Sequence, residues 1–456
     1  MSMLSRRSLL AASAAALAAR GSRAAPTSNA EVDVAIVGAG AAGVAAARRI
    51  AAAGRRVVVI EAADRIGGRC LTDTATFGVP VDRGAHWIHV PDLNPLMRLA
   101  PQTGLEIAPA PPGQKMRIGP RNAREGEMED YLAALVRATR AIGEAARKAD
   151  VSCTQALPKD LGDWRASIEF TLGPYGCSKD LGEVSAMDLA RSVERDADAF
   201  CRQGLGTLIA KLAAGLPVQR GAPVTAIDLN GRAGVEIATA RGHVSARGII
   251  VTVSTGVLLA SKIKFIPELP RRQLDAASKL ALGSYDRVIL ELPGNPLGLD
   301  RDDLVFEQAK DRHTAALLAN AGGSPLAMVD VGGSFGRDLA AQGEAAMSAF
   351  ALDWLAGLYG GDLRKAVKRT SATNWNAEPW VLGASSAAAP GAQPARRILM
   401  EPVRDRLWFA GEAAHETLWG TVGGAWESGE RAADAAMKRL GLTAEPRPPQ
   451  RTRQRR

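Results

Sequence analysis

The sequence predicts an α/β protein with a doubly wound parallel sheet, and three consecutive features near its start support this. A run rich in β-branched residues, Val32–Val37, has the apolar character of a buried strand. A glycine-rich turn and an alanine-rich helical stretch follow, and Gly54 ends the helix. Val57–Ile60 then forms a second apolar strand. This order is a βαβ unit, which favours a parallel sheet covered by helices on both faces.

The turn between the first strand and the helix has the composition of a phosphate site. Gly38, Gly40 and Gly43 follow the G-x-G-x-x-G spacing, and Glu61 ends the second strand. Gly38 permits a tight turn, Gly40 lets a pyrophosphate approach the backbone, and Gly43 lets the helix pack closely. The helix N-terminus offers free N–H groups to the phosphates, and Glu61 can accept hydrogen bonds from a ribose. The complete order predicts a Rossmann-like dinucleotide-binding domain rather than a purely structural βαβ unit. The expected contacts here are Gly38, Gly40, Ala41, Ala42, Gly43, Glu61 and Ala62.

The next motif indicates which dinucleotide binds. Residues 61–69 read EAADRIGGR. This run resembles the second half of the extended fingerprint of the FAD-dependent amine oxidase superfamily. The resemblance implies that Gly67, Gly68 and Arg69 lie along the pyrophosphate of FAD. A nicotinamide-dependent dehydrogenase has no need of this second turn, so the expected cofactor is FAD.

Residues 1–30 differ from the rest of the chain. No acidic residue precedes Glu31, and the run SRRSLL from Ser5 leads into the weakly apolar stretch Ala11–Ala19. Small residues surround Ala24, a plausible cleavage point. The segment resembles a twin-arginine export signal and is too short to remain in a bilayer. We therefore expect the twin-arginine translocation machinery as a partner and a periplasmic or secreted protein; a disordered basic leader is the alternative.

The net charge of +9 does not indicate nucleic-acid binding. Four arginines in the leader and five in the tail of residues 441–456 account for all of it. Residues 31–445 carry no net charge and offer no basic surface. The cysteines show no C-x-x-C spacing, so no metal site is expected. A disulfide among Cys153, Cys177 and Cys201 stays possible after export.

Residues 81–89, VDRGAHWIH, closely resemble the amine oxidase segment that passes beneath the flavin. The likeness is strongest to the polyamine oxidase branch, where the residue at the place of His89 faces the substrate. The resemblance implies cofactor contacts from Gly84, Ala85, His86 and Trp87. His86 equally fits a buried histidine bonded to the backbone.

The resemblance also divides the chain. The FAD-binding domain takes residues 31–100, 203–282 and 397–440, and an inserted α+β substrate domain takes 101–202 and 283–396. In the second FAD-binding stretch, the residue at the place of Val224 meets the adenine through its backbone.

Within the inserted domain, residues 127–148 are expected to form an amphipathic helix. Met128, Leu132, Leu135, Val136 and Ile142 lie near helical spacing, which is typical of a core stripe without chemistry. A further helix is expected over Asp338–Leu358, between strands at Ala327–Val331 and Thr370–Trp375.

Arg287 stands where most amine oxidases have a lysine that contacts the flavin through a water and is implicated in the reaction with oxygen. Arginine is planar, longer and never deprotonated, so the exchange is not conservative. It weakens the case for oxygen as electron acceptor and leaves a periplasmic redox protein as the other choice. Near Gly383, where some relatives attach the flavin through cysteine, this chain has none. FAD is therefore expected to bind noncovalently.

The last landmark is a strand, a turn and a helix whose N-terminus would point at the flavin. By resemblance, Gly411, Glu412, Thr421 and Val422 contact the cofactor, with Glu412 at its ribityl and phosphate region. Thr421 and Ser385 stand where monoamine oxidases carry the tyrosines of an aromatic cage. Trp419, Trp380 and His89 are the residues able to replace that wall, although Trp419 also fits a core position.

These observations predict oxidation of an amine at its C–N bond. Hydride transfer to flavin N5 would give an imine, which hydrolyses to an aldehyde or ketone. The expected catalytic residues are His89, Arg287, Trp419 and Thr421. An FAD-dependent desaturase of an isoprenoid or porphyrinogen-type substrate and a flavin-binding accessory protein without turnover are the alternatives.

Overall fold

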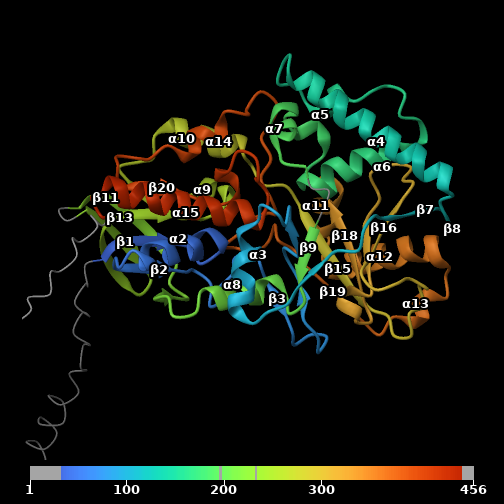
Figure 1. Cartoon of the computed structure of the whole chain (residues 1–456), viewed down its shortest axis with the longest axis horizontal. Coiled ribbons are helices and arrows are strands. Elements are labelled where there is room, and N and C mark those ends of the chain that lie inside the picture. Colours follow the sequence, from blue (N-terminus) through green and yellow to red (C-terminus); the bar gives the residue numbers. More distant parts are fainter. Residues whose placement is uncertain (1–31, 195–197, 232–233, 444–456) are drawn as a thin grey trace, which may run out of the picture.

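The computed structural model describes residues 32–194, 198–231 and 234–443. Figure 1 shows an elongated molecule with two lobes, each built around its own sheet. The predicted α/β class with a doubly wound sheet is confirmed. The predicted export signal, residues 1–30, and the predicted tail from residue 444 onward lie outside the described residues.

The first lobe is organised around a sheet that has eight strands within the described residues. They are β1 Val32–Val37, β2 Val57–Ile60, β10 Val218–Gln219, β11 Val224–Gly231, β12 Gly234–Thr239, β13 Gly242–Val251, β14 Lys264–Ile266 and β20 Leu407–Phe409. Their order is β10-β2-β1-β13-β12-β11-β14, and β20 pairs with the end of β13. Strands β10, β2, β1, β13 and β20 run parallel, while β12 pairs antiparallel with both β11 and β13.

Helices cover both faces of this sheet. They are α2 Ala41–Ala52, α3 Pro95–Leu99, α8 Leu205–Leu212, α9 Thr255–Leu259, α10 Arg271–Lys279, α14 Ala395–Met400 and α15 Val422–Arg439. Side chains alternate across β1, as the twofold strand period requires. Val34 and Ile36 pack into the core shared with α2 and α15, whereas Ala35 and Val37 pack into the core on the α10 side. Both faces of β1 are therefore buried from Val34 to Val37, which explains why that part of the strand is apolar.

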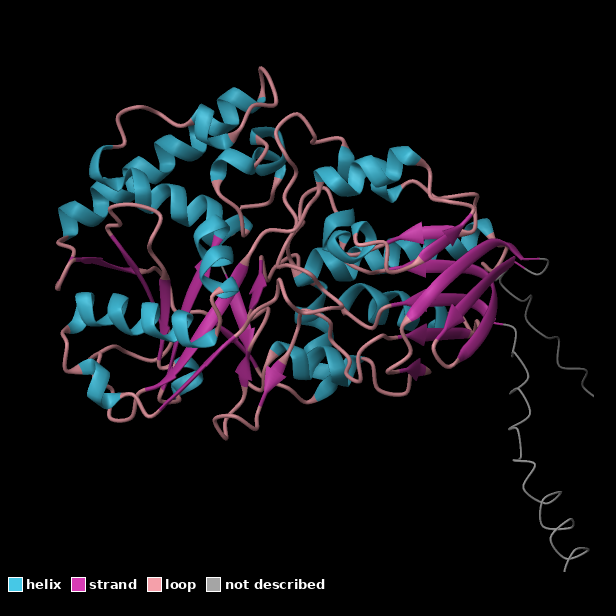
Figure 2. Ribbon diagram, turned by 180° about the vertical axis from the view of Figure 1, so that it is seen from behind, coloured by secondary structure: helices cyan, strands magenta, loops and turns pink. Residues whose placement is uncertain are grey.

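The second lobe contains a seven-stranded sheet in the described part of the chain, flanked by two layers of helices (Figure 2). Its strands are β7 Lys115–Ile118, β8 Arg121–Asn122, β15 Tyr285–Glu291, β16 Asp303–Glu307, β17 Ala316–Ala319, β18 Leu326–Gly332 and β19 Arg369–Ala372, in the order β19-β15-β18-β17-β16-β7-β8. One layer consists of α11 Gly333–Ala341, α12 Glu344–Tyr359 and α13 Leu363–Ala366. The other consists of α4 Glu125–Ala146, α5 Cys153–Ala156, α6 Arg165–Phe170 and α7 Ala186–Arg191.

Small strands occupy the junction of the lobes. They are β3 Thr72–Asp73 with β4 Val81–Asp82, and β5 Trp87–His89, β9 Asp198–Cys201 and β6 Ile107–Pro109 in the order β5-β9-β6. In the antiparallel pairing of β5 with β9, His89 lies directly opposite Asp198. The junction therefore brings together residues more than a hundred positions apart.

Two details differ from the expected helices. In α4, Leu132 and Val136 are exposed, and the buried residues are Tyr131, Ala134, Ala138 and Ile142. The predicted stripe was therefore partly wrong, because small alanines pack where larger residues were expected. The helix expected over 338–358 is broken into α11 and α12 at Gly343, whose φ of +94° lies outside the helical region.

None of the helices in the described residues is long and apolar enough to cross a membrane. All four cysteines are buried free thiols, so the disulfide left open by the sequence is not formed. No cluster of three or more His, Cys, Asp or Glu suited to a metal ion occurs in the part of the chain that the structure describes.

Candidate active site

One large cavity, of about 920 Å³, extends through the junction of the two lobes. Its walls come from β1, α2 and β2 at one end and from β15, β16 and α4 at the other. Nearly all residues expected to bind the cofactor or act on the substrate line it, and only Gly43 does not. The lining residues among them are Gly38, Gly40, Ala41, Ala42, Glu61, Ala62, Gly67, Gly68, Arg69, Gly84, Ala85, His86, Trp87, His89, Val224, Arg287, Gly411, Glu412, Trp419, Thr421 and Val422.

The glycine turn before α2 has the geometry of a phosphate cradle. Gly38 has a φ of +102°, and a Cβ on Gly43 would lie 1.9 Å from the carbonyl oxygen of Gly38. A Cβ on Gly40 would instead have its nearest neighbours 3.9 Å away, at Gly67 and Gly68. Gly43 is thus required for helix packing. The backbones of Gly40 and Gly68 lie against each other, since a Cβ on Gly68 would be 3.3 Å from Cα of Gly40, and both residues line the cavity. We call this end of the cavity the Gly40–Gly68 cleft. The first turn of α2 carries no acidic side chain, so its N–H groups remain suited to an anion.

Glu61 is held rigidly at the end of β2. Its Oε2 accepts a hydrogen bond from the backbone N–H of Ala39 at 2.6 Å, and its Oε1 accepts one from Ala63 at 2.8 Å. Burial raises the pKa of this carboxyl above its ordinary value, while the backbone hydrogen bonds oppose that rise. The carboxylate lines the cavity beside the cleft, where lone pairs not used by the backbone can accept from ribose hydroxyls.

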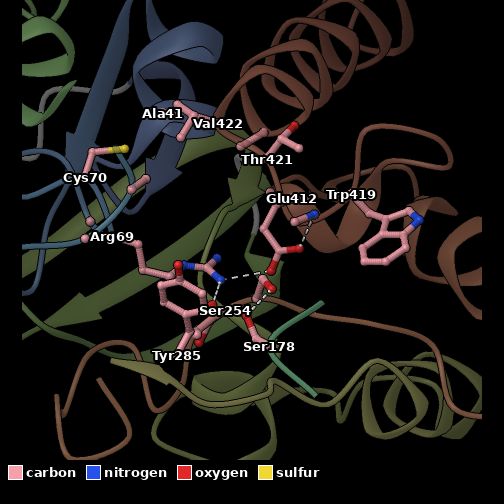
Figure 3. A pocket seen from close by; sticks show the side chains of 18 of the residues that line it. Ala41, Arg69, Cys70, Ser178, Ser254, Tyr285, Glu412, Trp419, Thr421 and Val422 are labelled. Carbon is pink, nitrogen blue, oxygen red and sulfur yellow. Dashed lines mark hydrogen bonds and ion pairs between the residues drawn. The ribbon is translucent and has the colours of Figure 1, made fainter. Parts of the chain in front are cut away.

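Arg69 and Glu412 join two distant parts of the chain across the cavity. Arg69 Nη1 donates to Glu412 Oε1 at 2.9 Å and also to the carbonyl oxygen of Ala384 (Figure 3). Glu412 Oε2 accepts from the hydroxyl of Ser386 at 2.7 Å and from the N–H of Gly420 at 3.0 Å. Both oxygens of the Glu412 carboxylate therefore accept hydrogen bonds from the protein.

Residues 84–87 form the wall between the cofactor end and the substrate end. A Cβ on Gly84 would lie 2.0 Å from the carbonyl oxygen of Arg69, so only glycine allows this close approach. His86 places Nδ1 3.0 Å from Asp82 Oδ2, and its Nε2 has no hydrogen-bond partner among the described residues although it is buried. The interpretation of His86 as a backbone-bonded histidine was therefore wrong, because its partner is a carboxylate.

His89 faces the cavity as half of a cross-strand pair. Its Nδ1 lies 2.7 Å from Oδ1 of Asp198, which also lines the cavity. Glu194 is a second carboxylate on this wall. The sequence singled out His89 but missed Asp198, because the pairing of β5 with β9 spans 109 positions.

Thr421 serves as a helix cap. Its hydroxyl accepts from the N–H of Gly424 at 2.9 Å and donates to the carbonyl oxygen of Leu418 at 2.6 Å. Both interactions fix the start of α15, whose N-terminus points into the cavity next to Val422. The expectation that Thr421 acts chemically has no support from this geometry, since its hydroxyl is already engaged.

Arg287 is buried and fully engaged. Its Nε and Nη2 donate to the two carboxylate oxygens of Asp330 at 2.7 and 2.9 Å, and Nη1 donates to the carbonyl oxygen of Asp82 at 2.8 Å. Burial alone would lower the pKa of Arg287, but the charge and hydrogen bonds of Asp330 raise it overall. The guanidinium therefore remains charged, with its fork directed at Asp330.

The substrate end has an aromatic wall that the sequence did not reveal. The ring of Tyr175 lies 5.0 Å from that of Phe306 and 6.1 Å from that of Tyr285, and all three line the cavity. Burial raises the pKa of both tyrosines, so their hydroxyls stay neutral. The three belong to separate segments with no shared motif, which is why only the fold brings them together.

The tryptophans expected to replace the aromatic cage line the cavity but differ in their exposure to solvent. Trp419 lines the cavity but is only 1% exposed, and its Nε1 donates to the carbonyl oxygen of Asp188 at 3.3 Å. Trp380 lines the cavity at a more exposed position, with Lys262 5.0 Å from its ring centre. Ser385 pairs its hydroxyl with that of Ser178 at 2.8 Å. Helix α4, which was assigned no chemistry, contributes Leu135 and Ile142 to the lining.

The residues present fit FAD. Gly40 and Gly68 expose side-chain-free backbone to the cavity, where a pyrophosphate can approach it, and the positions of Glu61 and Val224 suit an adenosine. The buried, unpartnered Nε2 of His86 is an unsatisfied polar atom on the same wall, as expected where a bound group supplies a partner.

Comparison with known proteins agrees with this geometry. The profile of the family described as flavin containing amine oxidoreductase matches residues 41–437. The chain is 30% identical to lysine-specific histone demethylase 1 homolog 2 of Arabidopsis thaliana, over 90% of this chain and 59% of that protein. It is 26% identical to polyamine oxidase 3 of Oryza sativa subsp. japonica, over 89% of each. The chain spans a little over half the length of the histone demethylase relatives that it matches.

Among solved structures, cyclohexylamine oxidase from Brevibacterium oxydans IH-35A has the same fold. The TM-score is 0.76 at 23% identity, and the match covers 90% of this chain and 99% of that one. The family profile begins with the first residue of α2 and includes the start of α15, and the N-terminal ends of both helices line the cavity. The chain belongs to the flavin-containing amine oxidoreductases, a family of FAD-dependent oxidoreductases.

Proposed function

We propose that this protein oxidises a small-molecule amine, with FAD as the immediate electron acceptor. The observation that carries the proposal is the continuity of the cavity from the Gly40–Gly68 cleft to the chamber walled by Tyr175, Tyr285 and Phe306. A dinucleotide seated in the cleft would present its reactive end to that chamber. FAD supplies a two-electron acceptor at N5.

The reaction removes a hydride from the carbon beside a neutral amine nitrogen, and the nitrogen lone pair forms the C=N bond. Water then adds to that carbon and releases the nitrogen, which leaves an aldehyde or ketone. His89 and Asp198 are placed to receive the amine end, because their paired side chains offer acceptors on the chamber wall. The aromatic side chains would exclude water and orient the C–H bond.

An anaerobic substrate screen tests this function. Purified, FAD-loaded protein is mixed with primary, secondary and polyamine substrates and with apolar isoprenoids, and the bleaching of the flavin is followed. Amines should bleach it rapidly. Bleaching by isoprenoids alone would instead support the desaturase alternative, and no bleaching would support an accessory role.

The chain offers a matched control for the amine site. His313 also pairs with an aspartate, since its Nδ1 lies 2.9 Å from Oδ1 of Asp311, but this pair is exposed and lies outside the cavity. His89→Ala should slow bleaching by amines by at least about tenfold, the usual effect of losing a positioned group. His313→Ala should leave the rate unchanged. Equal effects of the two variants would remove His89 from the reaction.

We propose that FAD is held noncovalently. Cys70, next to Arg69, lines the cavity, and burial raises the pKa of its thiol to about 12, with the charge of Asp82 adding to the effect. A neutral thiol is a poor nucleophile. Acid precipitation should therefore release all the flavin into the supernatant, whereas yellow precipitated protein would contradict the proposal.

We further propose that the electrons pass mainly to a periplasmic redox protein rather than to oxygen. Reaction of oxygen at a flavin is helped by an accessible positive charge and a positioned water. Arg287 directs its fork to Asp330 and to the carbonyl oxygen of Asp82, so it has little freedom to hold such a water.

The substitution Arg287→Lys tests the acceptor proposal. Lysine is shorter and has a single ammonium group, which leaves room for a water beside the cavity. Reoxidation of the reduced flavin by oxygen should accelerate, while reduction by the amine changes less. Rapid reoxidation in the unmutated protein, with no gain from lysine, would show that oxygen is the natural acceptor.

A periplasmic acceptor requires the protein to be exported. The twin-arginine signal predicted for residues 1–30 would provide the export route. Proteins on this pathway fold before they cross the membrane, which suits a protein that must bind FAD in the cytoplasm. We therefore place the mature protein in the periplasm or outside the cell.

A further inference from the structure

Asp330 lies directly across the sheet from Arg287. The two residues are cross-strand partners on β18 and β15. Their side chains form a bidentate ion pair, in which Nε lies 2.7 Å from Oδ1 and Nη2 lies 2.9 Å from Oδ2. Only 4% of the Arg287 side chain and 5% of the Asp330 side chain are exposed, so solvent screens neither charge.

The pair is connected to both ends of the cavity. The hydroxyl of Tyr285, on the aromatic wall, donates to Asp330 Oδ2 at 2.8 Å. On the other side, Nη1 of Arg287 donates to the carbonyl oxygen of Asp82, two residues before Gly84. Asp330 itself does not line the cavity, whereas Arg287 and Tyr285 do. Asp330 therefore does not touch the cofactor, and the charged partner between it and the cavity is Arg287.

We infer that Asp330 is a positioning residue that cancels the charge of Arg287 where the flavin ring binds. An unpaired guanidinium beside the cavity would act as a full positive charge on the ring. With a carboxylate fixed at hydrogen-bonding distance, the two charges act as a dipole, whose field falls more steeply with distance. The N-terminus of α15 remains as a source of positive potential, but it amounts to only about half a unit charge.

This charge cancellation explains the expected preference for a redox protein. A reduced flavin carries negative charge, and a nearby cation stabilises it and helps oxygen to react. Because Asp330 neutralises the charge of Arg287, the arginine stays in place but does not promote the reaction of the reduced flavin with oxygen. The inference rests on the proposed function, since it requires FAD in the cavity, but it does not depend on which substrate is oxidised.

Sulfite affinity tests the inference without turnover. Sulfite adds reversibly to N5 of oxidised flavins and bleaches them, and the adduct carries negative charge on the ring. Its dissociation constant therefore reports positive potential at the flavin in the FAD-loaded protein. Asp330→Asn leaves Arg287 uncompensated and should tighten sulfite binding by about tenfold or more, the order expected for one unit charge near a partly buried site. Asp330→Glu should restore weak binding.

Two further variants control for structural damage. Glu307→Gln removes a partly buried carboxylate of the same sheet, one that accepts from Thr314 and Trp354 rather than from a cation. It should leave the dissociation constant within about threefold of the unmutated value. The double variant Arg287→Gln/Asp330→Asn removes both charges, so it keeps no unpaired buried ion even if Asp330→Asn alone fails to fold.

The double variant shows whether the charge of Arg287 is cancelled by Asp330 or acts on the flavin. If Asp330 cancels its charge, the double variant should bind sulfite within about threefold of the unmutated protein. A loss of tenfold or more would show that Arg287 acts on the flavin uncancelled, and would overturn the inference. Unchanged affinity in a folded, yellow Asp330→Asn protein would overturn it as well. Colourless protein that folds normally would instead contradict the proposed FAD binding.

Discussion

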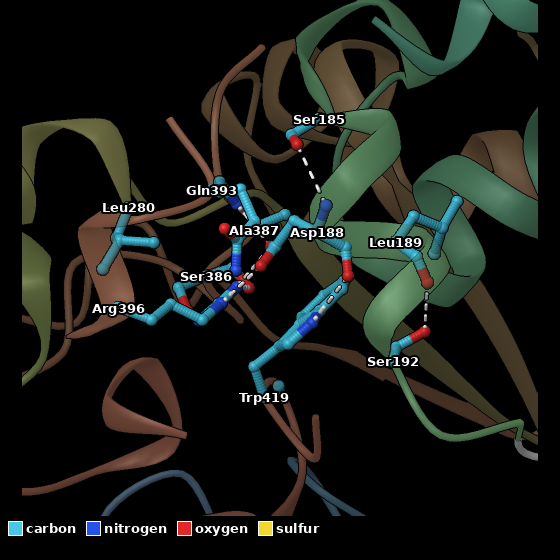
Figure 4. Close-up of polar contacts among 12 residues, drawn as sticks. Ser185, Asp188, Leu189, Ser192, Leu280, Ser386, Ala387, Gln393, Arg396 and Trp419 are labelled. Carbon is cyan, nitrogen blue, oxygen red and sulfur yellow. Dashed lines mark hydrogen bonds and ion pairs between the residues drawn. The ribbon is translucent and has the colours of Figure 1, made fainter. Parts of the chain in front are cut away.

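Asp188 and Arg396 form an ion pair with almost no exposure to solvent. Nε and Nη2 of Arg396 each lie 2.7 Å from a carboxylate oxygen of Asp188, and the side chains are 0% and 1% exposed (Figure 4). Asp188 belongs to α7 in the second lobe, whereas Arg396 belongs to α14 in the first. The guanidinium also lies 4.7 Å from the ring centre of Trp419. This pair therefore connects the lobes immediately behind the cavity wall.

Breaking this pair should cost considerable stability. Asp188→Asn leaves the arginine charge buried without a counterion, and the expected loss is about 3–5 kcal/mol of unfolding free energy. Urea unfolding provides the measurement. The control is Asp434→Asn, which breaks the exposed pair with Arg49 and should cost no more than about 1 kcal/mol. Similar losses in both variants would contradict the distinction between buried and exposed pairs.

Substitutions of Gly40 and Gly43, two glycines of the G-x-G-x-x-G motif, should have different effects. Gly40→Leu places a side chain where the pyrophosphate is expected to lie, without a clash with the protein, so the protein should fold but purify without FAD and therefore colourless. Gly43→Ala places a methyl group against the carbonyl of Gly38, so the protein itself should be destabilised. Flavin content and the thermal unfolding midpoint separate the two effects. Gly357→Ala, at an open position on α12, should keep the flavin and should not lower the unfolding midpoint, since alanine favours a helix more than glycine does. A yellow Gly40→Leu protein would contradict the assignment of the cleft.

Asp286 should make the protein less stable as the pH rises. Burial raises the pKa of this carboxyl from its ordinary value near 4 to about 6, against opposing hydrogen bonds from Trp375 and Thr373. The folded state therefore holds the proton more tightly than the unfolded state, and stability falls between about pH 4 and pH 6. Relative to Asp286→Asn, the unmutated protein should lose about 3 kcal/mol over that range. Urea unfolding at pH 4 and pH 7 measures the difference, and parallel pH profiles would disprove it.

Export should depend on the two arginines of the leader. Changing both Arg6 and Arg7 to lysine keeps the charge but removes the pair that a twin-arginine signal requires. A folded precursor containing FAD should then accumulate in the cytoplasm, as judged by cell fractionation. Normal periplasmic levels of the double variant would favour the alternative of a basic leader without a transport role.

Local sequence patterns predict the cofactor end of this fold well. The strand, glycine turn and helix around Gly38 are determined by interactions between near neighbours, so spacing alone identifies them. The observed β1 and β2 have the bounds that the apolar runs predicted. The glycine that breaks the expected helix at residue 343 was also visible in the sequence, but its left-handed conformation depends on how α12 packs.

The substrate end could not be predicted in the same way. Asp330 reaches Arg287 only because β15 and β18 pair in one particular register, 43 positions apart. Tyr175 meets Phe306 through the packing of a helical layer on a sheet. Such contacts depend on tertiary structure, and the residue types involved carry no spacing signal.

The interleaved sheet of the first lobe sets the order in which the binding site can appear during synthesis. Strands β1 and β2 leave the ribosome early. Strand β20 can join β13 only after residue 409 has been made, and the whole of α15 can cover α2 only after residue 439 (Figure 1). Until then, the side of α2 that carries Ala42 and Ala46 has no cover from α15, and neither Glu412 nor the start of α15 is available to a flavin. A nascent chain stopped at residue 400 would hold the entire glycine turn and still lack a complete site. Cofactor capture by this fold therefore has to wait until α15 has been made.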